Sequence, residues 1–172
     1  MNGNRSTRGA DPRWGGYNPV PAGMKRIQTN RFGEIDIVRD RIIRFDRGIS
    51  VNECHAKRFT LLAHESRAAM LWMQAVNEPS MSFLVADPLA FLTTEYTPEG
   101  PNDHLDPEGN TAILVTAWVN KEDGWLYGDL SNPLVINQQT RVGRRWWDPQ
   151  WSSEMRLMDM REIQSADQKE SE

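Results

Sequence analysis

The sequence predicts an all-β fold, a single-domain antiparallel β-barrel-like structure with little helix. Three observations support this prediction. About nine or ten short segments either alternate apolar and polar residues or are continuously apolar, which is the pattern of strands. Clusters of turn-forming residues separate these segments at short intervals. The chain has 172 residues, the usual size of one domain, and shows no internal repeat.

The beginning of the chain is rich in glycine, proline and arginine and shows no hydrophobic periodicity. Residues 1–23 are therefore expected to form a flexible extension, in which Trp14 and Tyr17 are either anchors for a partner or stray aromatics. Phe32–Val38 then alternates apolar and acidic residues. This alternation predicts a half-buried strand with one wet face.

The next predicted strands follow closely along the chain. A short turn at residues 39–40 predicts that Arg41–Phe45 returns as a second strand beside the first. The pattern breaks at residues 47–48, where an arginine precedes a glycine. Lys57–Ala63 alternates again and predicts a further strand.

Two segments in the middle of the chain, Met70–Val76 and Ser82–Ala86, are almost entirely apolar. Their lengths and their Pro and Asn boundaries favour strands over buried helix, and the short link between them predicts a hairpin. Residues 97–109 are rich in turn formers and are expected to be a loop. Thr111–Val119 is the strongest strand candidate, because it is long, β-branched and alternating. Weaker strands are predicted at Trp125–Leu130, Leu134–Asn137 and Thr140–Trp147.

The last part of the chain has features of a helix. Ser152–Ile163 begins with serines that can cap a helix, has Glu154 in its first turn, and contains three methionines for apolar cover. Residues 152–172 are therefore expected to be a C-terminal helix or tail. The β domain is expected to cover residues 24–151.

Composition indicates a cytoplasmic protein with a protein partner. The single cysteine excludes an internal disulfide and suits a reducing compartment. No apolar run approaches the length of a membrane span, and the N-terminus has no apolar stretch that resembles a secretion signal. The net charge of −4 argues against direct nucleic-acid binding and suits a basic protein partner.

Catalytic and metal-binding motifs are absent from the sequence. The three histidines (His55, His64 and His104) and Cys54 have no spacing typical of metal ligands, and no phosphate-binding signature is present. A Cys–His pair can be drawn from Cys54 and either His55 or His64, but such pairings arise easily by chance. We therefore expect no metal, no cofactor, no catalytic residue and no enzymatic activity.

A basic and aromatic cluster lies near the end of the predicted β domain. Arg144-Arg145-Trp146-Trp147, followed by Trp151, is a combination that can stack on bases. Strand alternation places Arg144 with Trp146 on one face and Arg145 with Trp147 on the other, so one tryptophan is expected to face the core. An RNA-contacting β-barrel is therefore the alternative function.

Five stretches, in this order and spacing, resemble the flagellar assembly factor FliW family. They are Ile27–Ile35 (IQTNRFGEI), Arg41–Ile49 (RIIRFDRGI), Leu71–Pro79 (LWMQAVNEP), Phe83–Pro88 (FLVADP) and Asp129–Gly143, which contains DLSNPLVIN and RVG. The sequence departs from the family pattern at Asp46, where proline is usual, at Asp129, where asparagine is usual, and at Asn132, where a small residue is usual. The loop at residues 97–109 is also shorter than is usual in the family.

The resemblance implies a binding protein without catalysis. Members of the FliW family bind newly made flagellin in the cytoplasm, and many also bind the translational regulator CsrA and stop it repressing flagellin mRNA. The resemblance also implies partner binding through Asp129, Leu130, Pro133, Ile136 and Asn137. From the residues alone, Leu130 and Ile136 are equally expected to be core, and Asn137 is equally expected to be a turn cap.

Overall fold

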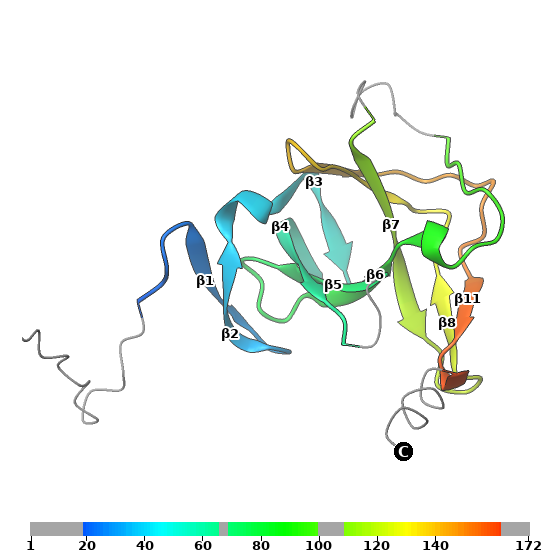
Figure 1. Ribbon diagram of the computed structural model, residues 1–172, viewed down its shortest axis with the longest axis horizontal. Coiled ribbons are helices and arrows are strands. Elements are labelled where there is room, and N and C mark those ends of the chain that lie inside the picture. Colours follow the sequence, from blue (N-terminus) through cyan, green and yellow to red (C-terminus); the bar gives the residue numbers. More distant parts are fainter. Residues whose placement is uncertain (1–18, 66–68, 100–108, 163–172) are drawn as a thin grey trace, which may run out of the picture.

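The computed structural model (Figure 1) describes residues 19–65, 69–99 and 109–162. The described residues form eleven strands and two short 3₁₀ helices, and the predicted all-β fold is confirmed. The elements are β1 (Met24–Thr29), β2 (Gly33–Val38), η1 (Arg39–Arg41), β3 (Ile43–Val51), β4 (Cys54–Ala63), β5 (Met70–Ala75), β6 (Ser82–Ala86), η2 (Pro88–Ala90), β7 (Thr111–Val119), β8 (Trp125–Gly128), β9 (Leu134–Asn137), β10 (Val142–Arg145) and β11 (Met155–Asp159). None of the helices in these ranges is long and apolar enough to cross a membrane.

Seven strands close into a barrel. Their order is β7-β6-β5-β4-β3-β10-β9, and β9 pairs back with the first half of β7. Every neighbouring pair in the ring is antiparallel except β3 and β10, which run parallel. The second half of β7 pairs with β6 on one edge and with β8 on the other, and β8 pairs with β11, so β8 and β11 extend the sheet on one side of the barrel (Figure 1).

Two apolar clusters fill this architecture. The first lies inside the barrel, where the rings of Phe45, Phe59 and Phe83 meet edge to face at centroid distances of 5.8 and 6.0 Å. The second joins the second half of β7 to β8 and β11 and includes Val115 and Leu126. Each fully buried side chain of this size stabilises the fold by about 1.5–3 kcal/mol relative to an exposed one.

The first hairpin is separate from the barrel strands. β1 and β2 form a two-stranded sheet, in which Arg26 donates two hydrogen bonds to the carboxylate of Asp36, at 2.8 and 2.9 Å. Ile27 and Ile37 pack this hairpin onto Val76. The predicted strand at Phe32–Val38 is confirmed, but the predicted pairing with the following strand is wrong. β2 pairs with β1, whereas β3 enters the barrel, where burial of its apolar side chains favours pairing with β4 and β10.

The break predicted at residues 47–48 is a bulge inside β3 and not its end. The register with β4 shifts between Arg44 and Ile49, and the strand then continues to Val51. Gly48 has φ +69°, a conformation that side chains disfavour, and a Cβ atom there would lie 2.4 Å from the ring of His55. Glycine therefore fits this position for two separate reasons.

The predicted helix at Ser152–Ile163 is wrong for most of the described residues, because strand β11 occupies the middle of this segment and only residues 161–162 are helical. β11 pairs with β8, and Leu157 packs closely on Gly128. A Cβ atom at residue 128 would lie 2.8 Å from the Leu157 side chain. Pairing with a distant strand therefore prevails over the local capping signals. The expected extension up to residue 18 (with Trp14 and Tyr17), loop residues 100–108 and the tail from residue 163 lie outside the described residues.

Candidate functional site

The segment between β8 and β9 begins with a closed turn, here called the Asp129 turn (residues 129–133). Asp129 is half-buried, and its Oδ1 accepts hydrogen bonds from the backbone N–H of Ser131 at 3.0 Å and from the Ser131 hydroxyl at 2.6 Å. Its Oδ2 accepts from Nδ2 of Asn132 at 2.9 Å. The aspartate thus holds its own backbone in a turn, which is a common role for this residue type.

Four hydrogen bonds tie the Asp129 turn to distant parts of the chain. They are Asp129 N–H to Thr116 O at 2.9 Å, Leu130 N–H to Ser152 O at 2.9 Å, Asp148 N–H to Ser131 O at 2.7 Å, and Tyr96 O–H to Leu130 O at 2.6 Å. Because these contacts come from four separate segments, the conformation of the turn is determined by the whole fold.

Tyr96 contacts the Asp129 turn from the interior of the protein. Its side chain is buried, with 3% of the residue exposed, and its ring meets that of Trp151 edge to face at 4.7 Å. Burial raises the pKa of the Tyr96 hydroxyl, and the negative charges of Asp148 and Asp129 raise it further. The hydroxyl therefore stays protonated at neutral pH and donates to the carbonyl of Leu130.

The five residues predicted to bind a partner lie in and after this turn. Leu130, Pro133 and Ile136 are buried, so the structure gives their side chains a packing role. Asp129 is half-buried beside Asn132, which is also half-buried, and these two side chains present polar groups at the surface of the turn. Partner binding by this segment stays a prediction.

Asn137, the last of the five, ends β9. It is 6% exposed, and its Oδ1 accepts hydrogen bonds from the backbone N–H groups of Gln139 and Thr140, both at 2.9 Å. It therefore caps the turn that leads into β10, as the alternative expectation for this residue states. Its position fixes where β9 ends and where the next strand begins.

An outer aromatic face, which sequence reasoning did not single out, lies next to the Asp129 turn. We define it as Trp118, Trp125, Tyr127 and Arg156. Trp118 is 37% exposed and stacks on Tyr127 with ring centroids 5.9 Å apart. The guanidinium of Arg156 lies 5.3 Å from the Trp125 ring centroid. Alternation along Thr111–Val119, which opposes Trp118 to the buried side chains, was the signal that could have identified it.

The arginine and tryptophan cluster is only partly brought together. Arg144 and Arg145 are exposed, and Trp147 is 69% exposed. Trp146 is half-buried, and its Nε1 donates to the carbonyl oxygen of Glu99 at 2.9 Å. Both tryptophans lie beyond the end of β10, so strand alternation does not place them.

Trp151, the third aromatic candidate for base stacking, is directed elsewhere. It belongs to the apolar cluster of β8 and β11, where its ring packs on Tyr96. The set of residues on which the RNA-contacting alternative depends is therefore not gathered on one surface.

The residues considered for catalysis or metal binding have other contacts. The Sγ of Cys54 lies 3.5 Å from the hydroxyl of Ser80, and the ring of His64 stacks on Trp72. His55 Nδ1 shares a hydrogen bond with the Ser50 hydroxyl at 2.9 Å. Within the described ranges, no three His, Cys, Asp or Glu side chains come close enough to hold a metal ion. His104 lies outside these ranges.

Comparison with known proteins agrees with this architecture. The family described as FliW protein matches residues 25–147. A flagellar assembly factor FliW of Nitratidesulfovibrio vulgaris (strain DP4) is 35% identical over 124 residues, which cover 68% of this chain and 69% of that protein. The corresponding protein of Syntrophus aciditrophicus is 33% identical over 118 residues, which cover 65% of this chain and 73% of that protein.

A relative of similar coverage and a solved structure extend the comparison. The flagellar assembly factor FliW of Leptospira interrogans (serovar Lai) is 27% identical, over 70% of this chain and 83% of that protein. A crystal structure of the flagellar assembly factor FliW superposes with a TM-score of 0.66 at 26% identity, covering 78% of this chain and 97% of the other. The barrel, the order of its motifs and the match over residues 25–147 together show that the chain belongs to the FliW family of flagellar assembly factors.

Proposed function

We propose that this protein is a non-enzymatic, cytoplasmic assembly factor that binds flagellin and antagonises CsrA, and thereby couples flagellin synthesis to flagellin export. Membership of a family of flagellar assembly factors supports the flagellar role. The observation that supports binding most directly is the Asp129 turn, a surface turn whose conformation is held by hydrogen bonds within the fold.

The charge of the chain suits an RNA-binding partner such as CsrA. Proteins that bind RNA phosphates are basic on the binding face, and this chain has a net charge of −4. At the proposed site Asp129 is half-buried in the turn, and buried Asp148 is joined to the same turn by its backbone N–H, which donates to Ser131 O at 2.7 Å. Complementary charge would increase the association rate and the specificity for a basic partner.

The outer aromatic face suits an apolar partner such as the unassembled ends of flagellin. Trp118 pairs directly with Tyr127 across β7 and β8. Tyr127 lies on β8, and the Asp129 turn begins directly after that strand. An apolar helix lying on this face would cover the exposed tryptophan and reach the Asp129 turn, and aromatic side chains are common at the centre of protein interfaces.

Two partners that compete for one protein would form a switch. While flagellin accumulates it would occupy this protein, and CsrA would remain free to repress flagellin mRNA. When flagellin is exported, the freed protein would remove CsrA from the message. The linkage is that of any two ligands whose binding is mutually exclusive or negatively coupled.

Titration calorimetry tests the proposal. The full chain is titrated with flagellin and with CsrA of the same bacterium, first separately and then with the second partner already bound. We expect affinities of about micromolar or tighter for each partner, and we expect one partner to reduce the affinity for the other. If a folded protein produced no binding heat with either, the proposed function would be wrong.

Two variants at one position then test the site. Asp129→Ala removes the acceptors that close the turn, and we expect it to weaken partner binding about tenfold, or about 1.4 kcal/mol. Asp129→Asn is the matched control, because an amide keeps an acceptor oxygen for Ser131 and asparagine is usual there in the family. Retained binding by the asparagine variant would show that turn shape matters more than charge. Parental binding by the alanine variant would place the site elsewhere.

A further inference from the structure

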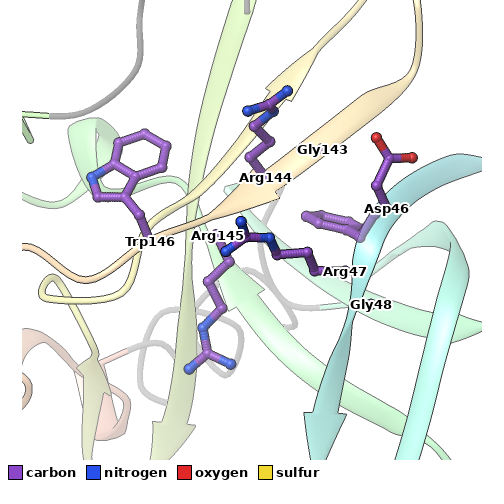
Figure 2. A pocket seen from close by; sticks show the side chains of 8 residues that line it. Asp46, Arg47, Gly48, Gly143, Arg144, Arg145 and Trp146 are labelled. Carbon is purple, nitrogen blue, oxygen red and sulfur yellow. The ribbon is translucent and has the colours of Figure 1, made fainter.

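A pocket opens where β3 and β10 separate. Their parallel ladder has two residue pairs, Val142 with Arg44 and Gly143 with Phe45. Beyond these pairs β3 bulges, while β10 continues beside β9 as far as Arg145. The two strands therefore diverge, and a pocket of about 380 Å³ lies between them (Figure 2).

Positive charge dominates the pocket. Arg47 comes from the bulge, and Arg144 and Arg145 come from β10. All three are exposed, and none of them makes an ion pair within the described part of the chain. The one carboxylate of the lining, Asp46, is engaged by Arg44 at 3.2 Å. In a chain with net charge −4, this is a local excess of positive charge.

The walls of the pocket also offer aromatic surface and backbone. Trp146 stands at one side, where its indole is fixed by the hydrogen bond to Glu99. Phe45 forms the floor against Gly143, where a Cβ atom would lie 2.4 Å from the phenyl ring. The backbone of residues 46–48 has no paired residue in either neighbouring ladder. Extended peptides bind to backbone groups of this kind at sheet edges.

We propose that this pocket binds an acidic, extended segment of a protein partner. Acidic side chains of the segment would contact the guanidinium groups of Arg47, Arg144 and Arg145, each on its own side of the gap, and a neighbouring apolar side chain would pack on Trp146. Guanidinium groups bind carboxylates with two parallel hydrogen bonds, which gives such pairs both strength and geometry. This site is separate from the Asp129 turn and does not depend on the function proposed above.

The geometry favours a peptide over a nucleic acid. Figure 2 shows Arg144 and Arg145 extending in opposite directions from β10, so they do not form a continuous track for a phosphate backbone. Trp151 is half-buried in the second apolar cluster, so it offers no stacking surface at the pocket. Proteins that bind single strands combine a positive groove with several stacking platforms, and this pocket has one half-buried tryptophan.

Fluorescence anisotropy with the full chain tests the proposal. The probe is a fluorescein-labelled octapeptide that alternates glutamate and leucine, and the comparison probes are its lysine counterpart and a labelled oligouridine of the same length. We expect the acidic peptide to bind, to bind more weakly as salt screens the charges, and to bind more tightly than either comparison probe. The double variant Arg47→Glu, Arg144→Glu should weaken this binding at least tenfold, by the order of one lost charged pair.

Lys121→Glu is the matched control, because it introduces a glutamate at an exposed position in the turn after β7, away from the pocket. It should bind the peptide within about twofold of the parent, since surface charges far from a site are screened. Circular dichroism melts of all variants establish that they are folded. The proposal would be overturned by tighter binding of oligouridine, by no binding of the acidic peptide to the parent, or by equal binding to the double variant.

Discussion

The Asp129 turn and the β3–β10 pocket lie at opposite ends of the segment from residue 129 to residue 145, and their polar groups are used differently. In the turn, the side chains of Asp129, Ser131 and Asn132 all bond within the protein. In the pocket, Arg47, Arg144 and Arg145 make no ion pair within the described residues. Groups that the fold has already engaged determine stability, whereas exposed charges with no such role are available to a partner.

The largest expected effect breaks the floor of the pocket. Gly143→Val would place a Cβ atom 2.4 Å from the phenyl ring of Phe45, in the middle of the barrel wall. We expect the free energy of unfolding to fall by about 3 kcal/mol, since overfilled cores strain both side chains and backbone. Urea unfolding measures this loss. Arg144→Val on the same strand is the control, and an equal loss in both variants would contradict the packing argument.

A smaller effect is expected at the support of the turn. Tyr96→Phe removes the 2.6 Å hydrogen bond to the carbonyl of Leu130 and leaves that buried oxygen without this donor. We expect a loss of about 1–2 kcal/mol in the free energy of unfolding. Tyr127→Phe is the control, because its hydroxyl bonds to Asp123 at a partly exposed position. A larger loss in the control would mean that the turn does not depend on Tyr96.

The pH dependence of stability sharpens the same point. The pKa of Tyr96 is raised in the folded state by burial and by Asp148 and Asp129, so the unfolded chain loses this proton first. The contribution of the protonated Tyr96 hydroxyl to the free energy of unfolding is fully present below about pH 10, the ordinary tyrosine pKa, and declines as pH rises towards the pKa of the folded state. Urea unfolding between pH 9 and about pH 11 should show a steeper decline for the parent than for Tyr96→Phe. Equal slopes would contradict the assignment.

The smallest expected effect is on stability at the pocket arginines. Arg145→Ser removes an exposed side chain that makes no ion pair within the described residues, so the free energy of unfolding should change by no more than about 0.5 kcal/mol. Thermal melts and urea curves of the purified variant measure this difference. A loss of several times that size would show that the pocket is part of the folding core, which would remove the contrast with the Asp129 turn.

The sequence predicted strands well where their patterns were strong and local. The bounds of Thr111–Val119 and Leu134–Asn137 agree with β7 and β9, because β-branched alternation and flanking turns define both ends. Ser152–Ile163 was wrongly predicted as helix, since the partner that makes β11 a strand is distant in sequence. The predicted partner of β2 was wrong, and the parallel pairing of β3 with β10 was not predicted. Local sequence patterns identify strands but do not say which strands pair.

Among the site residues, too, local roles could be predicted from the sequence, whereas contacts between distant strands could not. The capping roles of Asp129 and Asn137 are local, and residue type alone suggests them. The pocket could not be predicted, because Arg47 and Arg144 come from strands that are far apart in the chain and that meet through a single parallel pairing. The outer aromatic face was in principle visible as a tryptophan on the wet side of an alternating strand, but its stacking partner Tyr127 is on another strand.

The closure of the barrel has a consequence during protein synthesis. The first half of β7 pairs with β9, and β3 pairs with β10, and both partners are synthesised later. Both edges of the growing sheet therefore stay unpaired until residues 134–145 have left the ribosome. Unpaired edges are templates for association with other chains, and pairings across long sequence distances form slowly. The nascent chain therefore passes through a stage in which it is prone to aggregate. Truncation before β9 keeps five of the seven barrel strands and removes β9 and β10, so it should yield insoluble protein.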